Sequence, residues 1–243
     1  MAQQEEGKRV LIFVRHGRSI FNELYKESES DCPASDPWVI DSELSERGFE
    51  QVRQFNQDLN KLLNCDGEKR IISSPLTRCI QTCFCVLESH QALPKGEEKI
   101  ILDPDCTELE ESSCDVGSTF EELSNGKLKD VLENNFDLKL IEGRGKWWYQ
   151  NENNKDQTLH FEEWDVFMKR MDQFIDRLFN KYFEKVDTVI VFSHFTFIRE
   201  CVNAIAKKYN KETALSIIGD QPQQTKSIPI TDLENREVVV LHL

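Results

Sequence analysis

Residues 9–19 read RVLIFVRHGRS, and this stretch decides the fold. A continuous apolar run is typical of a strand buried on both faces, as in a parallel sheet. Two later stretches repeat the pattern: KRIIS at 69–73 runs into Ser74-Pro75, and TVIVFS at 188–193 runs into His194. We therefore predict three buried strands, each followed directly by polar residues.

Helical patterns separate these strands, and strands that alternate with helices predict a parallel sheet with helices on its faces. We expect one α/β domain over 8–243, with a mostly parallel central sheet covered on both faces, behind a disordered tail at 1–7. Residues 27–36 and 151–156 read as surface loops. The predicted helices begin at Ser45 and run to Leu63, span Ser74–Leu87, open at a capping box Ser118–Glu121, and cover 161–182 and 197–209. Further strands are expected at 99–102, 227–230 and 236–241.

Ligands of such sheets bind beyond the carboxyl ends of the strands. The residues expected at that rim are cationic or can become so: Arg15, His16, Arg18, Arg78 and His194. This cationic group belongs to a chain whose formal net charge is −14. The overall charge excludes nonspecific binding to nucleic acid and to anionic membranes, whereas a local cationic pocket can still hold an anionic substrate.

The composition also bounds the cellular context. The first ten residues, MAQQEEGKRV, lack the basic and apolar segments of a secretory signal. No apolar run approaches the ~20 residues of a membrane span. We expect a cytoplasmic protein whose eight cysteines are reduced thiols, not disulfides.

A phosphoryl group is the ligand that best suits the cationic residues of this rim. Arginine forks match phosphate oxygens, and each charge-assisted bond contributes roughly 1.5–3 kcal/mol. Flanking arginines disfavour the cationic form of His16, which leaves an imidazole nitrogen able to attack phosphorus. The chain contains no Walker glycine loop and no carboxylate cluster with obvious metal spacing. We therefore expect a metal-independent enzyme without a cofactor.

Four ordered motifs carry a resemblance to a known family. They are Arg15-His16-Gly17-x-Ser19-x-x-Asn22, Leu44-Ser-Glu-Arg-Gly48-x-x-Gln51, Ser73-Ser-Pro-Leu-x-Arg78-x-x-Gln81-Thr82 and Ser193-His194. Together they resemble the histidine phosphatase superfamily, in its phosphoglycerate mutase-like branch. The segment Glu108–Gly117, ELEESSCDVG, resembles a subgroup of that branch with broad or unassigned substrates.

The resemblance implies a role for each matching residue. His16 would take the phosphoryl group as a phosphohistidine, and Arg15, Arg78 and His194 would hold its oxygens. Asn22 would add an amide donor to the phosphate site. Glu108 would protonate the leaving oxygen and then deprotonate the attacking water.

Two positions depart from the family pattern. Arg18 stands where glutamate is frequent, and Phe195 stands where glycine is usual. We expect Arg18, Arg144 and Lys146 to contact the substrate away from the transferred group. The aromatic run 147–149 lines the substrate pocket in one interpretation and packs in the core in the other.

Three functions remain open on the sequence. The leading hypothesis is a phosphomonoester hydrolase that acts on a small phosphorylated metabolite. The first alternative is a mutase of the phosphoglycerate mutase type, which returns the phosphoryl group to another hydroxyl. The second is a catalytically inactive module that binds phosphorylated ligands.

Overall fold

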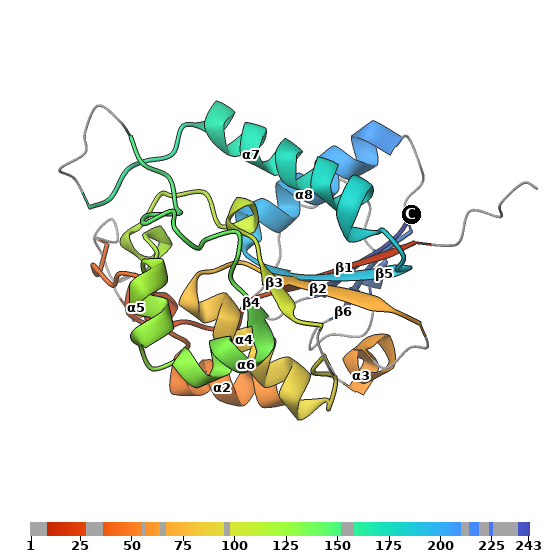
Figure 1. Ribbon diagram of the computed structural model, residues 1–243, viewed down its shortest axis with the longest axis horizontal. Helices are drawn as coiled ribbons and strands as arrows, with labels where there is room; N and C mark the ends of the chain where they lie inside the picture. The colour runs from red at the N-terminus through yellow and green to blue at the C-terminus, as the bar shows by residue number, and fades with distance from the viewer. Residues whose placement is uncertain are drawn as a thin grey trace, which may run out of the picture.

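The computed structural model describes residues 9–27, 36–54, 57–63, 67–94, 98–151, 158–209, 214–218, 224–225 and 238–243. Within them, one eight-stranded sheet crosses the molecule in the order β4-β3-β2-β5-β1-β8-β6-β7 (Figure 1). The strands are β1 (Val10–Arg15), β2 (Lys69–Ser73), β3 (Ile100–Leu102), β4 (Phe136–Asp137), β5 (Thr188–Ser193), β6 (Ala214–Ile218), β7 (Gln224–Thr225) and β8 (Val238–His242).

The five strands from β4 to β1 in this order are parallel, and β8, β6 and β7 continue the sheet antiparallel. The predicted α/β domain with a mostly parallel sheet is thus confirmed. Arg15 pairs with Ser193, and Ser73 pairs with Phe192. The carboxyl ends of β1, β5 and β2 are therefore level with one another.

Helices cover both faces of the sheet, as Figure 1 shows. Alternate residues of β1 point into two cores: Ile12 packs in the core that holds Ile80, and Phe13 packs in the core that holds Phe197. Around the first core lie α2 (Glu46–Arg53), α4 (Thr77–Ser89) and α6 (Lys129–Asn135), and around the second lie α7 (Trp164–Arg177) and α8 (Phe195–Tyr209). The other helices are α1 (Ile20–Glu27), α3 (Gln57–Leu63) and α5 (Phe120–Asn125), with short helical turns at Pro104–Cys106, Ser113–Asp115 and Leu178–Tyr182.

Two predicted helix starts are wrong. The helix expected from Ser74 begins at Thr77; the Ser74 hydroxyl accepts the Leu76 N–H at 3.3 Å and also lies 2.8 Å from Nε2 of His194. The capping box expected at Ser118 is formed one residue later, by Thr119 with Glu122. The Ser118 hydroxyl instead donates to a carboxylate from a distant loop, that of Asp41, at 2.6 Å.

Other expectations need smaller corrections. Ser45 does cap its helix, accepting the Gly48 N–H at 3.0 Å, but α2 ends at Arg53 and α3 follows as a separate helix. The helix expected from Phe161 begins at Trp164, and Phe161 itself is 70% exposed. The tail 1–7, the strand at 227–230 and most of both predicted loops lie outside the described residues.

Candidate active site

The ends of three parallel strands bring the predicted histidines together. His16 follows β1 and donates its backbone N–H to the Ser193 carbonyl at 3.0 Å. Ser74 follows β2 and donates its backbone N–H to the Phe192 carbonyl at 2.9 Å. The imidazole rings of His16 and His194 lie 5.1 Å apart between centroids. The rim predicted from the sequence therefore exists around these residues.

His16 has the protonation pattern of a nucleophile. Its Nδ1 donates to the Gly17 carbonyl at 2.7 Å, so the ring proton sits on Nδ1 and the lone pair on Nε2. Burial, reinforced by the charges of Arg78 and Arg15, holds the pKa of His16 well below its ordinary value. The ring is only 5% exposed. At neutral pH the imidazole is therefore neutral and basic at Nε2.

Gly17 fixes the turn after the nucleophile against α4. Its N–H donates to the Thr82 hydroxyl at 2.9 Å, which in turn donates to the Arg78 carbonyl at 2.7 Å. A Cβ at position 17 would lie 2.6 Å from a methyl group of Val52. Only glycine fits this close approach without displacing α2.

Arg78 lies at the start of α4 and is 2% exposed. Its Nη2 donates to Oδ1 of Asp115 at 2.8 Å, and its Nη1 donates to the Cys114 carbonyl. Burial raises the pKa of Asp115 to about 6, so this carboxylate is ionised at neutral pH and balances the guanidinium. Each terminal nitrogen carries a second N–H, which suits Arg78 to a phosphoryl oxygen.

His194 is fully buried at the end of β5. Its Nε2 lies 2.8 Å from the Ser74 hydroxyl and 3.4 Å from the Cys79 sulfur. Burial, followed by the charge of Arg78, holds the pKa of His194 well below its ordinary value. Burial also raises the pKa of Cys79, which keeps that neighbour a neutral thiol. The second histidine is therefore neutral and held in place.

Arg15 packs against Phe195, the residue that departs from the family pattern. The Arg15 guanidinium carbon lies 5.2 Å from the ring centroid, and that of Arg199 lies 5.1 Å from the same centroid. Both distances are within the range of a cation–π interaction. Phe195 thus supports Arg15, which is predicted to bind the phosphate.

Glu108 lies at the amino end of α8. Its carboxylate accepts N–H groups from Thr196 at 3.1 Å and Phe197 at 3.2 Å. Arg170 donates to the carbonyls of Thr107 at 2.9 Å and Glu108 at 2.6 Å, and so holds the loop that carries the carboxylate. This anchoring brings Glu108 within electrostatic reach of Arg78.

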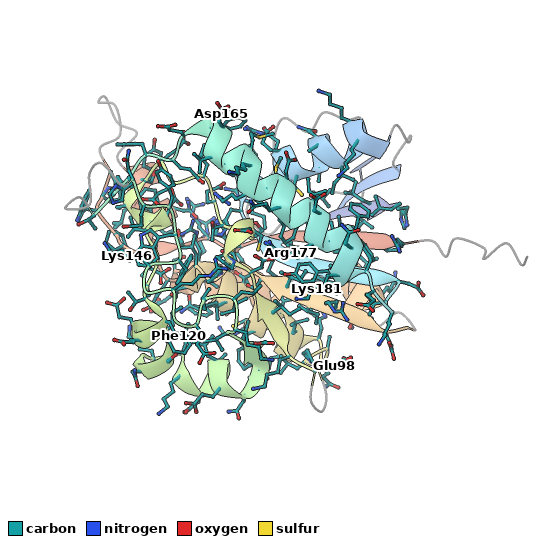
Figure 2. All side chains as sticks on the ribbon, turned by 45° about the horizontal axis from the view of Figure 1, so that its top comes forward. Glu98, Phe120, Lys146, Asp165, Arg177 and Lys181 are labelled. Carbon is teal, nitrogen blue, oxygen red and sulfur yellow. The ribbon has the colours of Figure 1, made fainter. Side chains whose placement is uncertain are left out.

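The remaining predicted ligands are placed differently. The Asn22 side-chain oxygen accepts the Ser19 N–H at 3.1 Å, so only its amide nitrogen could donate to a phosphate. Arg18 pairs with Glu23 at 2.8 Å. Arg144 and Lys146 are exposed, and Figure 2 shows Lys146 at one side of the molecule. Their contact with substrate stays a prediction.

Several residues of the site escaped the sequence analysis. Asp115 belongs to the quoted CDVG run. It pairs with Arg78, which is too far away in the sequence for a local pattern to predict the contact. Glu110 is 2% exposed although it stands in an acidic run that reads as solvated. Trp147 and Trp148 pack in the core and also line a cavity beside Glu108; that substrate enters this cavity stays a prediction.

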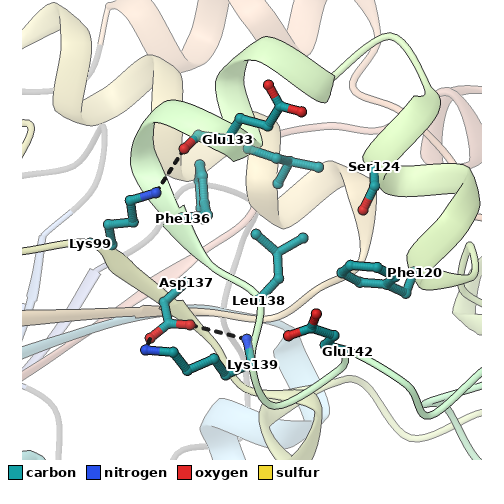
Figure 3. Close-up of a pocket in the computed structure, with 10 residues that line it drawn as sticks. Lys99, Phe120, Ser124, Glu133, Phe136, Asp137, Leu138, Lys139 and Glu142 are labelled. Atoms are coloured by element: carbon teal, nitrogen blue, oxygen red, sulfur yellow. Dashed lines mark hydrogen bonds and ion pairs between the residues drawn. The ribbon is translucent and has the colours of Figure 1, made fainter.

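A second cavity, of about 550 Å³, opens beside α6 and β4 (Figure 3). Both lysines that line it already have partners. Lys99 donates to the Glu133 carbonyl at 2.7 Å, and Lys139 pairs with Asp137 at 3.3 Å. None of its lining residues is a predicted catalytic or phosphate-binding residue. The candidate site is therefore the rim at His16 and not this cavity.

The described residues also bear on metals and membranes. Among them, no three His, Cys, Asp or Glu side chains gather in a way that could hold a metal ion. Cys79, Cys83 and Cys85 carry free thiols, the first two buried. No helix in the described part of the chain is both long and apolar enough to cross a membrane.

The sequence matches the family model "Histidine phosphatase superfamily (branch 1)" over residues 11–239. Among solved structures, it is similar to the ecdysone phosphate phosphatase of Bombix mori in complex with tungstate, at 14% identity and a TM-score of 0.53, over 96% of this chain and 88% of that one. A phosphoglycerate mutase from Bacillus anthracis str. Sterne matches at 17% identity and a TM-score of 0.50, over 92% and 93%. No curated protein sequence matches the chain.

Proposed function

The chain belongs to the histidine phosphatase superfamily (branch 1), and from that membership we propose that it hydrolyses phosphate monoesters of a small metabolite through a phosphohistidine at His16. One observation carries the proposal: a neutral imidazole, with its lone pair on Nε2, stands beside the buried cation Arg78. The first group suits attack on phosphorus, and the second suits the charge that the attack creates.

The first half-reaction transfers the phosphoryl group to the enzyme. Arg15, Arg78 and His194 hold the phosphoryl oxygens while Nε2 of His16 attacks phosphorus. The P–N bond forms as the bond from phosphorus to the leaving oxygen breaks. Glu108 gives its proton to that oxygen, and the free alcohol departs.

The second half-reaction releases phosphate. Glu108, now a carboxylate, takes a proton from a water molecule whose oxygen attacks phosphorus. The P–N bond breaks, and His16 recovers its lone pair. The N–H groups of Thr196 and Phe197 hold the Glu108 carboxylate in one place for this step.

Hydrolysis is favoured over mutase activity by the surroundings of Glu108. Two of the three residues that follow it are glutamates, and none of residues 109–118 is Lys, Arg, His or Tyr. This segment therefore offers no cationic side chain to pair with the carboxylate that a phosphoglycerate carries next to its phosphate. An assay with phosphoglycerate, primed with bisphosphoglycerate, separates the two activities because only a mutase isomerises the substrate.

The proposal is tested by hydrolysis of para-nitrophenyl phosphate. Arginines supply the positive charge that a metal would otherwise supply, so activity should survive EDTA. Vanadate, which mimics five-coordinate phosphorus, should inhibit. Activity lost to EDTA and restored by Mg²⁺ would contradict the mechanism, and no hydrolysis at all would favour the inactive binding module.

A further inference from the structure

A small cavity of about 130 Å³ lies directly beside the candidate proton donor. We call it the Glu108 cavity. Its walls come from the loop that carries Glu108, from the aromatic run 147–149 and from α7. The residues that line it are Pro104, Asp105, Thr107, Glu108, Glu110, Asp115, Trp147, Trp148, Tyr149, Glu162, Val166 and Arg170. Because it adjoins both Glu108 and the partner of Arg78, it is where the alcohol part of a substrate would lie.

Two polar atoms in this wall are buried without a partner. Oε1 of Glu110 accepts the His160 N–H at 2.9 Å, but Oε2 meets no hydrogen-bond partner among the residues that the structure describes. Nε1 of Trp148 is likewise buried and has no hydrogen-bond partner among those residues. An unsatisfied buried polar atom costs roughly 1–3 kcal/mol, so these two atoms indicate a ligand that would satisfy them.

The charge of the wall indicates the sign of that ligand. Five of the lining residues are carboxylic acids, and Arg170 is the one base among them. Arg170 donates to both oxygens of Glu162 at 2.7 Å, and Arg78 and Arg177 pair with Asp115 and Asp105.

Glu108 is bound by backbone N–H groups. Within the described part of the chain, Glu110 is thus the lining carboxyl that has neither a cationic partner nor a hydrogen bond to its second oxygen. Burial raises the pKa of Glu110 to about 8, so in the empty cavity its carboxyl stays protonated at neutral pH.

We propose that the Glu108 cavity is the leaving-group subsite and that Glu110 there pairs with a primary ammonium group, so that the substrates are phosphate monoesters of small amino alcohols. This rests on the phosphatase function proposed above. An ammonium donates N–H to Oε2 of Glu110, and the three neighbouring aromatic rings attract a cation. The volume corresponds to about four water molecules, which restricts the alcohol to a few heavy atoms.

The proposal is tested by equilibrium binding to His16→Ala, which retains the ligand unhydrolysed. Phosphoethanolamine is compared with propyl phosphate, in which a methyl group replaces the ammonium, so the contribution of the shared phosphate cancels in the ratio. We expect phosphoethanolamine to bind about tenfold more tightly, as one partly buried charge pair provides. Phosphoserine, which adds a carboxylate to the same amine, should bind more weakly than phosphoethanolamine.

Matched variants locate the effect. Glu110→Gln, added to His16→Ala, should bring the two dissociation constants together, whereas Glu111→Gln, which changes the exposed neighbour, should preserve the preference. Equal affinities before any change at Glu110, or a preference that survives Glu110→Gln, would overturn the proposal.

A readout that needs no change at Glu110 is proton release. The charged neighbours of Glu110 are Asp115, Glu162 and Arg170. A bound ammonium stabilises the ionised form of Glu110, so calorimetry at pH 7 should detect more proton release with phosphoethanolamine than with propyl phosphate, whose phosphate alone can lose a proton on binding. Equal proton release with both ligands would count against the pairing. Hydrolysis of para-nitrophenyl phosphate by the wild-type protein reports separately on the phosphatase function.

Discussion

The guanidinium carbon of Arg15 lies 5.2 Å from the centre of the Phe195 ring. Arg15 immediately precedes His16, and Phe195 immediately follows His194, so this contact joins the two candidate catalytic strand ends. The ring holds a cationic side chain in the position from which it would bind a phosphoryl oxygen.

Replacing Phe195 by Leu keeps the bulk of the side chain and removes its aromatic face. A cation–π contact contributes roughly 0.5–2 kcal/mol, so kcat/KM for para-nitrophenyl phosphate should fall by about 2- to 30-fold. Phe195→Tyr retains the aromatic face and should keep nearly full activity. A Leu variant as active as the Tyr variant would show that the contact does not support Arg15.

Replacing Glu108 by Gln removes the proposed proton donor, while its one remaining oxygen can still accept one of the two N–H groups of Thr196 and Phe197. Substrates with poor leaving groups, such as alkyl phosphates, should lose far more activity than para-nitrophenyl phosphate, whose leaving group departs without a proton. Glu111→Gln serves as the control. Equal losses on both substrates would move the assignment to another carboxyl group, with Glu110 first.

Two substitutions at Arg78 separate its contribution to folding stability from its predicted role in binding phosphate. Arg78→Met leaves Asp115 buried without its cation, which should lower the free energy of unfolding by about 3–5 kcal/mol. Arg78→Lys keeps a charge beside Asp115 but loses the planar fork. Its unfolding should change less, while kcat/KM falls at least about tenfold. Urea unfolding and steady-state kinetics measure both, and wild-type kinetics with Lys would contradict the phosphate role.

Nuclear magnetic resonance of the imidazole carbons tests the protonation of the site. Because burial and Arg78 lower both pKa values, His16 and His194 should stay neutral through about pH 6.5, where an ordinary histidine takes up a proton. The signals are assigned with His16→Ala and His194→Ala. A site histidine that titrates at the ordinary value would remove the argument for a neutral nucleophile.

The sheet and the polar residues at its strand ends could be predicted because both follow from local sequence. A continuous apolar run such as 10–14 has few alternatives to a buried strand, and the residue after it must lie at the rim. Helix starts were less predictable, because Ser118 could serve as a cap but binds Asp41 instead, and the Ser74 hydroxyl contacts both the Leu76 N–H and His194.

The surroundings of the catalytic residues depend on long-range packing. Nothing local distinguishes Glu110 from Glu111, yet the first is buried in a cavity wall and the second is exposed. In the same way, the sequence marks Phe195 only as a departure from the family pattern, whereas the fold places its ring against Arg15. Side chains that meet across the fold have no signal in the spacing of one sequence.

The central claim is that His16 carries the phosphoryl group, and rapid quenching of wild-type enzyme mixed with radiolabelled substrate tests it most directly. The account predicts an enzyme-bound label that is stable to alkali, labile to acid and located by mass spectrometry on His16. The label should be absent from His16→Ala and present in His90→Gln, which changes the histidine that directly follows α4. Substrate turnover without a labelled intermediate, or a label on another residue, would contradict the account.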